Sequence, residues 1–189
     1  MLARALRPAA VGVLLLCFLQ VSFAAQRQYR LPERGVFSMD VPDGWRDQLR
    51  QPPRALPPTI ALRAARGQPF EVLVTPMWPA DPADAAPSRG SIRKQVERFA
   101  DGIRSQTVER TLRLIEFAGA AGLGYYFSAT DRAAKPGQYK FMTQGAVKVG
   151  ELAVIFTILT NDGQEQVTRD ALAMVRSAVH VRAGQSLRP

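Results

Sequence analysis

Hydrophobic and polar residues alternate in several short segments of this chain, with the two-residue period of a half-buried β-strand. In the first, Phe37, Met39 and Val41 alternate with polar Ser38 and Asp40, and a Pro-Asp-Gly turn sequence follows. Further strand-like runs lie at residues 59–65, 69–78, 108–117, 123–130, 138–149 and 151–160. The last four follow one another closely, which predicts an antiparallel meander.

Two other segments show a helical period. The first has one apolar stripe with spacings of four, three and four residues, formed by Ile92, Val96, Phe99 and Ile103. Ser91 is placed to cap this helix, and Asp162 with Glu165 forms a capping box at the start of the second. The inward face of the second helix is predicted to carry Val167, Ala171, Met174, Val175 and Ala178.

The order of elements is strands, a helix, four strands and a helix, with connections long enough for both helices to cover an antiparallel sheet. This order predicts an α+β layered domain rather than a doubly wound parallel sheet. We expect two main helices and a mainly antiparallel sheet of about six to seven strands. They form a single domain over residues 36–181.

Four segments are expected to lie outside regular structure. Residues 25–35 are polar and basic and predict a flexible N-terminal segment, with edge pairing as the alternative. Residues 46–58 contain four prolines and predict a loop with at most one helical turn. Residues 79–87 read as a surface connector, and residues 182–189 as a frayed tail.

The N-terminus has the pattern of a secretory signal peptide over residues 1–24. Arg4 and Arg7 precede the apolar run of residues 11–19, and small residues lead to a cleavage site between Ala24 and Ala25. The predicted location is the bacterial periplasm, without a transmembrane span after cleavage. An uncleaved signal that anchors the protein in the inner membrane is the alternative. A lipidated Cys17 is disfavoured because a bulky leucine precedes it.

Removal of residues 1–24 changes the chemistry available to the chain. It takes two of the 25 basic residues and the single cysteine, and leaves 23 basic against 16 acidic residues, a formal charge of +7. Without cysteine, the remaining chain has no disulfide, no thiolate nucleophile and no thiolate metal ligand.

Candidate catalytic residues are few. His180, the only histidine, follows the second helix and is expected to act as a cap at its C-terminus. Asp40, Asp43 and Asp47 surround a turn and lack the spacing of a calcium loop, so we expect no metal site. No motif for a cofactor is present. A carboxylate pair such as Asp131 with Glu151 remains open as the basis of a hydrolase acting on an anionic polymer.

The run Phe37-Ser-Met-Asp-Val-Pro-Asp-Gly-Trp45 resembles the opening of PsbP-like domains and their bacterial relatives. The aromatic strand Gly124-Tyr-Tyr-Phe127 and the terminal helix are similar to theirs as well, so that the resemblance spans residues 36–179. It implies an α/β/α sandwich around an antiparallel sheet and a role as a binding or assembly subunit. Histidines implicated in metal binding in the plant member have no counterparts in this chain.

The candidate binding surface combines basic and aromatic residues: Arg89, Arg93, Lys94, Arg98, Trp45, Trp78 and Tyr126. Our leading hypothesis is an exported, non-catalytic binding or assembly module of the cell envelope. Its partner would be an envelope protein or an anionic lipid or polymer. Export argues against nucleic acid as the partner. Because Glu97 and Asp101 interleave with the arginines, a merely solvated helix face is the alternative to a lipid-binding surface.

Overall fold

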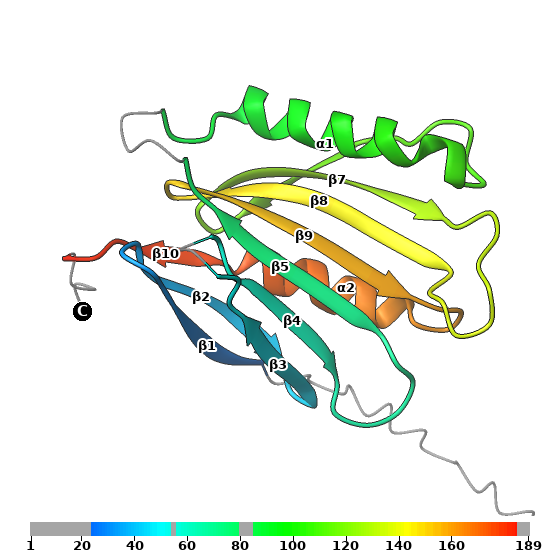
Figure 1. Ribbon diagram of the computed structural model, residues 1–189, viewed down its shortest axis with the longest axis horizontal. Coiled ribbons are helices and arrows are strands. Elements are labelled where there is room, and N and C mark those ends of the chain that lie inside the picture. The colour runs from blue at the N-terminus through cyan, green and yellow to red at the C-terminus, as the bar shows by residue number, and fades with distance from the viewer. Residues whose placement is uncertain (1–23, 54–55, 80–84, 185–189) are drawn as a thin grey trace, which may run out of the picture.

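A computed structural model describes residues 24–53, 56–79 and 85–184. In this part of the chain, ten strands and two helices form an α+β structure with two antiparallel sheets (Figure 1). The strands are β1 (Ala24–Leu31), β2 (Gly35–Pro42), β3 (Trp45–Arg50), β4 (Thr59–Ala64), β5 (Glu71–Met77), β6 (Ile115–Gly119), β7 (Gly122–Thr130), β8 (Phe141–Val149), β9 (Leu152–Thr160) and β10 (Val179–Val181). The helices are α1 (Arg89–Ile103) and α2 (Glu165–Arg176), and Arg104–Gln106 adds one 3₁₀ turn.

The larger sheet has seven strands in the order β3-β4-β5-β9-β8-β7-β6. Strands β6 to β9 are neighbours in sequence order, which confirms the predicted meander. The turn from β8 to β9 passes through Gly150, whose φ of +60° is in the left-handed region. The smaller sheet has the order β1-β2-β10.

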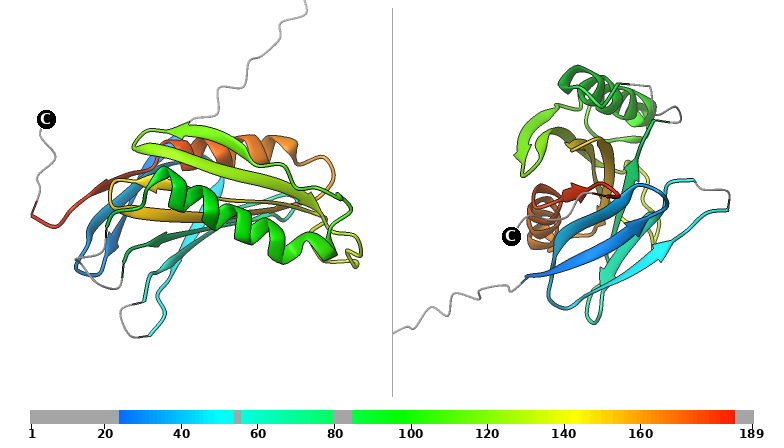
Figure 2. Two further views of the ribbon diagram at one scale, coloured as in Figure 1. Left: turned by 90° about the horizontal axis from the view of Figure 1, so that it is seen from above. Right: turned by 90° about the vertical axis from the view of Figure 1, so that its left-hand side faces the viewer.

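The two helices lie on opposite sides of the seven-stranded sheet (Figure 2). Alternation along β7 and β9 accounts for this arrangement, since neighbouring side chains point to opposite faces. Phe127 packs with Ile92 and Val96 of α1, whereas Phe156 belongs to the core shared by α2 and both sheets. The predicted α+β class, with two helices and mainly antiparallel sheet, is therefore confirmed.

The expectation of a flexible segment at residues 25–35 was wrong, and the alternative of edge pairing is confirmed. The segment forms most of β1, an edge strand that pairs with β2 from Ala24 opposite Pro42 to Leu31 opposite Gly35. A side-chain network explains its order. Arg27 forms an ion pair with Asp47, and the Tyr29 hydroxyl donates to Asp47 Oδ2 at 2.9 Å. Burial, together with this hydrogen bond, raises the pKa of Tyr29.

The expected loop at residues 46–58 was wrong in its first part. β3 continues to Arg50 and pairs with β4, and the prolines begin only at position 52. The strand expected at residues 108–117 begins only at Ile115. The first error missed the whole of β3, whereas the second misplaced only the start of a predicted strand.

The helix caps also differ from the prediction. Ser88, not Ser91, caps α1, and Ser91 completes the capping box as its third helical residue. At α2 the cap is Gln164, with no side-chain hydrogen bond to the helix, and Asp162 binds Lys140 Nζ at 2.8 Å instead. Asp162 lies two residues before this cap and is therefore outside the capping position.

Candidate functional site

A cavity of about 290 Å³ lies at one end of the structure. Five segments that are distant in sequence line it: the β1–β2 turn, the residues after β5, Ala86 before α1, the β8–β9 turn and the β10 segment. The β1–β2 turn, the β8–β9 turn and β10 are on the left in Figure 1. We call this cavity the end cavity and define it by Glu33, Arg34, Trp78, Glu151, His180 and Arg182. Of these residues, the sequence singled out Trp78, Glu151 and His180, each in a separate role.

Tight backbone packing holds the β1–β2 turn against β10. Gly35 has a φ of +89°, and a Cβ added there would lie 2.6 Å from the Ala183 nitrogen and still closer to the Val181 carbonyl oxygen. Glu33 also adopts a positive φ, 58°, which is uncommon for a residue other than glycine. The backbone of the turn is therefore held in one conformation, which places Arg34 beside β10.

His180 helps to hold this arrangement. Its helix ends at Arg176, and the histidine lies in β10, so the expected helix-capping role was wrong. Its Nε2 lies 2.6 Å from the Arg34 carbonyl oxygen, and because a carbonyl only accepts, Nε2 carries the proton. In the neutral ring, Nδ1 is then the free acceptor.

The two arginines of the end cavity differ in their partners. Arg182 forms an ion pair with Glu151 from the β8–β9 turn. The Arg34 guanidinium lies 5.9 Å from the centroid of the half-buried Trp78 ring, within cation–π range. Arg34 forms no ion pair with any residue that the structure describes. The cavity thus presents one arginine that is supported by an aromatic ring and open to an anion.

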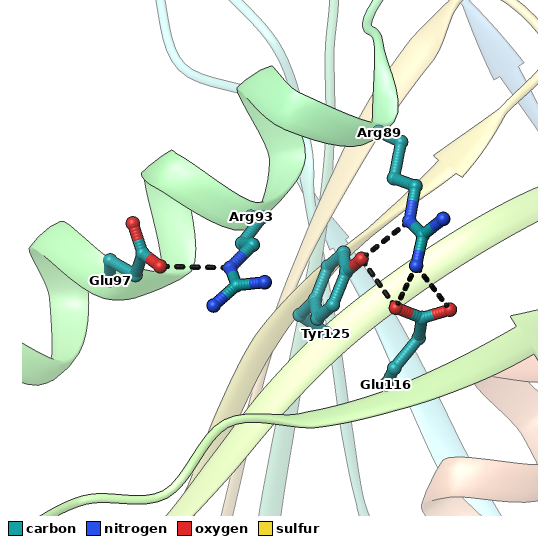
Figure 3. A network of polar contacts seen from close by, with 5 residues as sticks. All are labelled: Arg89, Arg93, Glu97, Glu116 and Tyr125. Atoms are coloured by element: carbon teal, nitrogen blue, oxygen red, sulfur yellow. Dashed lines mark hydrogen bonds and ion pairs between the residues drawn. The ribbon is translucent and has the colours of Figure 1, made fainter.

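The basic residues of α1 form a different kind of surface, shown in Figure 3. Arg89 donates from Nε to the Tyr125 hydroxyl at 2.8 Å and from Nη2 to Glu116 at 2.7 and 3.1 Å. The Tyr125 hydroxyl donates to Glu116 Oε2 at 2.5 Å. Arg93 lies 6.0 Å from the Tyr125 ring and bonds Glu97 at 2.9 Å.

These contacts stabilise the ionised forms of the groups that make them. Hydrogen bonds from Tyr125 and Arg89 lower the pKa of Glu116, and bonds to Tyr125 and Glu116 raise the pKa of Arg89. The bond to Glu97 likewise raises the pKa of Arg93. Two of the four candidate cations on α1 are therefore neutralised within the protein. Lys94 and Arg98 remain exposed, and Arg98 bonds Gln95.

The aromatic candidates do not join these cations in one surface. Trp45 was expected to be exposed but is 9% exposed and packs on Phe70, with ring centroids 4.5 Å apart. Tyr126 points to the face opposite α1 and packs on Phe117 at 5.8 Å. The combined binding surface suggested by the sequence is therefore divided among four places.

The proposed carboxylate pair is also separated. Asp131 follows β7 at one end of the seven-stranded sheet, and Glu151 lies in the β8–β9 turn at the other. The nine residues of β8 run between them, which at roughly 3.4 Å each corresponds to about 30 Å. Paired carboxylates of a glycosidase lie within about 10 Å of each other, so this pair cannot act on one bond.

The described residues offer neither a clustered set of metal ligands nor a membrane-spanning helix. These residues contain no group of three or more histidine, cysteine, aspartate or glutamate side chains placed to hold a metal ion. None of their helices has the length and apolar character needed to cross a membrane. The predicted leader up to residue 23 lies outside these ranges. Ala24 and Ala25, which flank the expected cleavage site, are exposed at the start of β1.

Two solved structures are similar to this chain. LpqN, a protein involved in cell envelope biogenesis of Mycobacterium tuberculosis, has 13% identity and a TM-score of 0.46, with 82% of this chain and 90% of that chain covered. The cyanobacterial PsbP (CyanoP) of Synechocystis sp. PCC 6803 has 12% identity and a TM-score of 0.47, with 92% and 98% covered. The second is a PsbP protein, the kind that the sequence motifs resemble. No family model and no curated protein matches the chain.

Proposed function

We propose that this protein is an exported, non-catalytic binding or assembly module of the bacterial envelope, and that the end cavity binds an anionic group of its partner. The observation that carries the proposal is Arg34, which lies over the Trp78 ring without an ion-pair partner in the described part of the chain. A half-buried guanidinium in a cavity is a suitable donor for a carboxylate or phosphate.

The surroundings of Arg34 favour an anion that also has an apolar part. Trp78 offers a ring surface, Arg182 adds a second guanidinium, and two carboxylates, Glu33 and Glu151, also line the cavity. Glu151 already pairs with Arg182, so an anion would compete with Glu151 for that arginine. Arg34 is then the primary contact, and Arg182 a secondary one.

The geometry of β1 is compatible with the proposed export. Cleavage between Ala24 and Ala25 would remove only the first residue of β1 and leave the pairing from Ala25 opposite Val41 onward. N-terminal sequencing of the chain from a periplasmic fraction should therefore begin at Ala25. An intact chain held in the membrane fraction would instead support the anchored form, and an intact chain in the cytoplasm would contradict export.

Tryptophan fluorescence can test the proposed site, because the chain has two tryptophans and only Trp78 lines the end cavity. The probes are glycerol 3-phosphate, for a free phosphate, and phosphatidylglycerol vesicles, for a lipid headgroup, with phosphatidylcholine vesicles as the uncharged control. We expect a saturable change in emission that is absent in Trp78→Phe. A response to the soluble probe indicates a free anion, and a response to vesicles alone indicates the headgroup.

Matched arginine variants separate the end cavity from the helix. Arg34→Gln should weaken binding at least tenfold, whereas Arg98→Gln, on the exposed face of α1, should leave it unchanged. Equal binding by wild type and Arg34→Gln would contradict the proposal. So would the absence of any response to both probes.

A further inference from the structure

We infer that the protein has a second binding site, for a neutral saccharide, at the end of the sheet opposite the end cavity. A cavity of about 270 Å³ lies there, where the ends of β7, β8 and β9 meet the first turn of α2. We call it the hydroxyl pocket and define it by Ser128, Thr130, Thr143, Thr160, Glu165 and Thr168. It is independent of the end cavity and of the function proposed for it.

The hydroxyl groups of this pocket arise from strand alternation. Ser128 and Thr130 are two residues apart on β7, so they face the same side of the sheet. Thr143 is opposite Ser128 in the β7–β8 register, and their hydroxyl oxygens are 2.8 Å apart. The same face becomes apolar further along these strands, where the core of α2 begins. The polar side chains are thus concentrated at the uncovered end of this face.

This lining disfavours an apolar ligand. Thr143 and Thr160 are 6% and 5% exposed. The Thr143 hydroxyl already pairs with Ser128, but no side-chain partner for the Thr160 hydroxyl is found among the described residues, so an apolar group seated there would cut it off from water at a cost of about 1–3 kcal/mol. A ligand with several hydroxyl groups can both donate to and accept from these hydroxyls.

An anionic ligand is disfavoured by two carboxylates. Glu109 lines the pocket and accepts hydrogen bonds from Thr130, at 2.9 Å from its nitrogen and 2.7 Å from its hydroxyl. Burial alone would raise the pKa of Glu109, but these bonds outweigh it and the pKa is lowered, so the group is ionised at neutral pH. Glu165 adds a second negative charge from α2.

Most of the polar side chains in the pocket are hydroxyls. Ser128, Thr130, Thr143, Thr160 and Thr168 outnumber the two carboxylates. Lys140 lies beside the pocket, with its Nζ 5.1 Å from the centroid of the Phe141 ring, but its charge is already paired with Asp162. A neutral polyhydroxylated ring is the ligand class that can form hydrogen bonds with the largest number of these groups. The Phe141 side chain provides an apolar contact for the C–H face of such a ring.

The test uses saturation-transfer NMR with three monosaccharides: glucose, N-acetylglucosamine and N-acetylmuramic acid. The last two share a ring and differ in a lactyl carboxylate. We expect saturable binding of at least one neutral sugar, with a Kd on the order of 1 mM, as is reasonable for a ligand of this size. N-acetylmuramic acid should bind at least fivefold more weakly than N-acetylglucosamine.

Three variants locate the site. Thr143→Val keeps the side-chain shape but removes a hydroxyl, and Glu165→Gln changes an exposed side chain that the fold does not need. Each should weaken binding at least fivefold. Thr157→Val is the matched control, because Thr157 lies on the opposite face of β9 and bonds Gln144. If Thr143→Val does not fold, the affinity of Glu165→Gln for the sugar is the result that tests the site.

The inference is overturned if no neutral sugar gives saturable binding up to 50 mM, or if N-acetylmuramic acid binds more tightly. It is also overturned if Glu165→Gln leaves the affinity unchanged. An affinity that falls in Arg34→Gln instead would assign the sugar to the end cavity.

Discussion

The two ends of the β8–β9 hairpin carry different polar groups. At the turn, the end cavity combines two arginines, a histidine and a tryptophan with two carboxylates, Glu33 and Glu151, and it is built from segments far apart in sequence. At the other end, the hydroxyl pocket has five serine or threonine hydroxyls and two carboxylates, and most of them come from neighbouring strands. Arginine thus lines one of these two cavities and not the other, so the net positive charge of the chain does not describe both ends of the sheet.

We expect the largest effect from Gly35→Ala, which changes the packing of the β1–β2 turn at the end cavity and does not touch the hydroxyl pocket. A Cβ at this positive φ would collide with the backbone of β10, and we expect a loss of about 3 kcal/mol in the free energy of unfolding. Gly67→Ala is the matched control. Gly67 has a φ of +91° but no atom within 4 Å of an added Cβ, so it should lose only about 1 kcal/mol. Urea unfolding measures both, and equal losses would show that the turn and β10 are not tightly joined.

The next effect is on binding at the two ends. In the double variant Arg34→Gln with Glu165→Gln, each substitution should weaken only the ligand of its own end, tenfold for the phosphate and fivefold for the sugar. Because the sites are separated by most of the length of β8, the effects should be independent. If either substitution also weakened binding of the other ligand, the two sites would not be independent.

A smaller effect is expected in the pH dependence of stability, to which Glu109 of the hydroxyl pocket contributes. Since the folded pKa of Glu109 is lowered, its contribution to stability is fully present above its unfolded pKa, about 4.3, and is lost as the pH falls through the folded value. Glu109→Gln should therefore cost about 1 kcal/mol at pH 7 and flatten the decline in stability below pH 5. Urea unfolding between pH 3 and 7 measures this dependence. If Glu109→Gln loses as much stability below pH 5 as the wild type, the predicted contribution of Glu109 is wrong.

The smallest effect is expected at the exposed helix cations. Lys94→Gln and Arg98→Gln should each change the free energy of unfolding by less than about 0.5 kcal/mol, because exposed charges contribute little. Neither should alter binding of phosphate or sugar. A marked loss of vesicle binding in these variants would instead support the hypothesis that α1 binds anionic lipid.

The sequence predicted the architecture well because periodicity and burial are directly related. The meander and the two helices follow from alternation and from helical spacing. The errors lie where a tertiary contact decides. β1 is ordered by Asp47 from a later strand, and α2 begins two residues later than a cap at Asp162 requires, while Asp162 pairs with Lys140.

The end cavity could not be found in the same way. Arg34 lies in a segment expected to be flexible, Arg182 in an expected tail and His180 at an expected helix end, and no local pattern relates them. One signal was available, since Val179 and Val181 flank His180 with the alternation of a strand. That the strand pairs with β2 and meets the β1–β2 turn depends on the whole fold.

The most direct measurement of the central claim is a chemical-shift map of the ¹⁵N-labelled mature chain titrated with glycerol 3-phosphate. We predict saturable shifts at the Arg34 side chain, the Trp78 indole and the amides of β10, with the α1 amides around Lys94 and Arg98 unchanged. Shifts centred on α1, or none at the end cavity at saturating phosphate, would contradict the account.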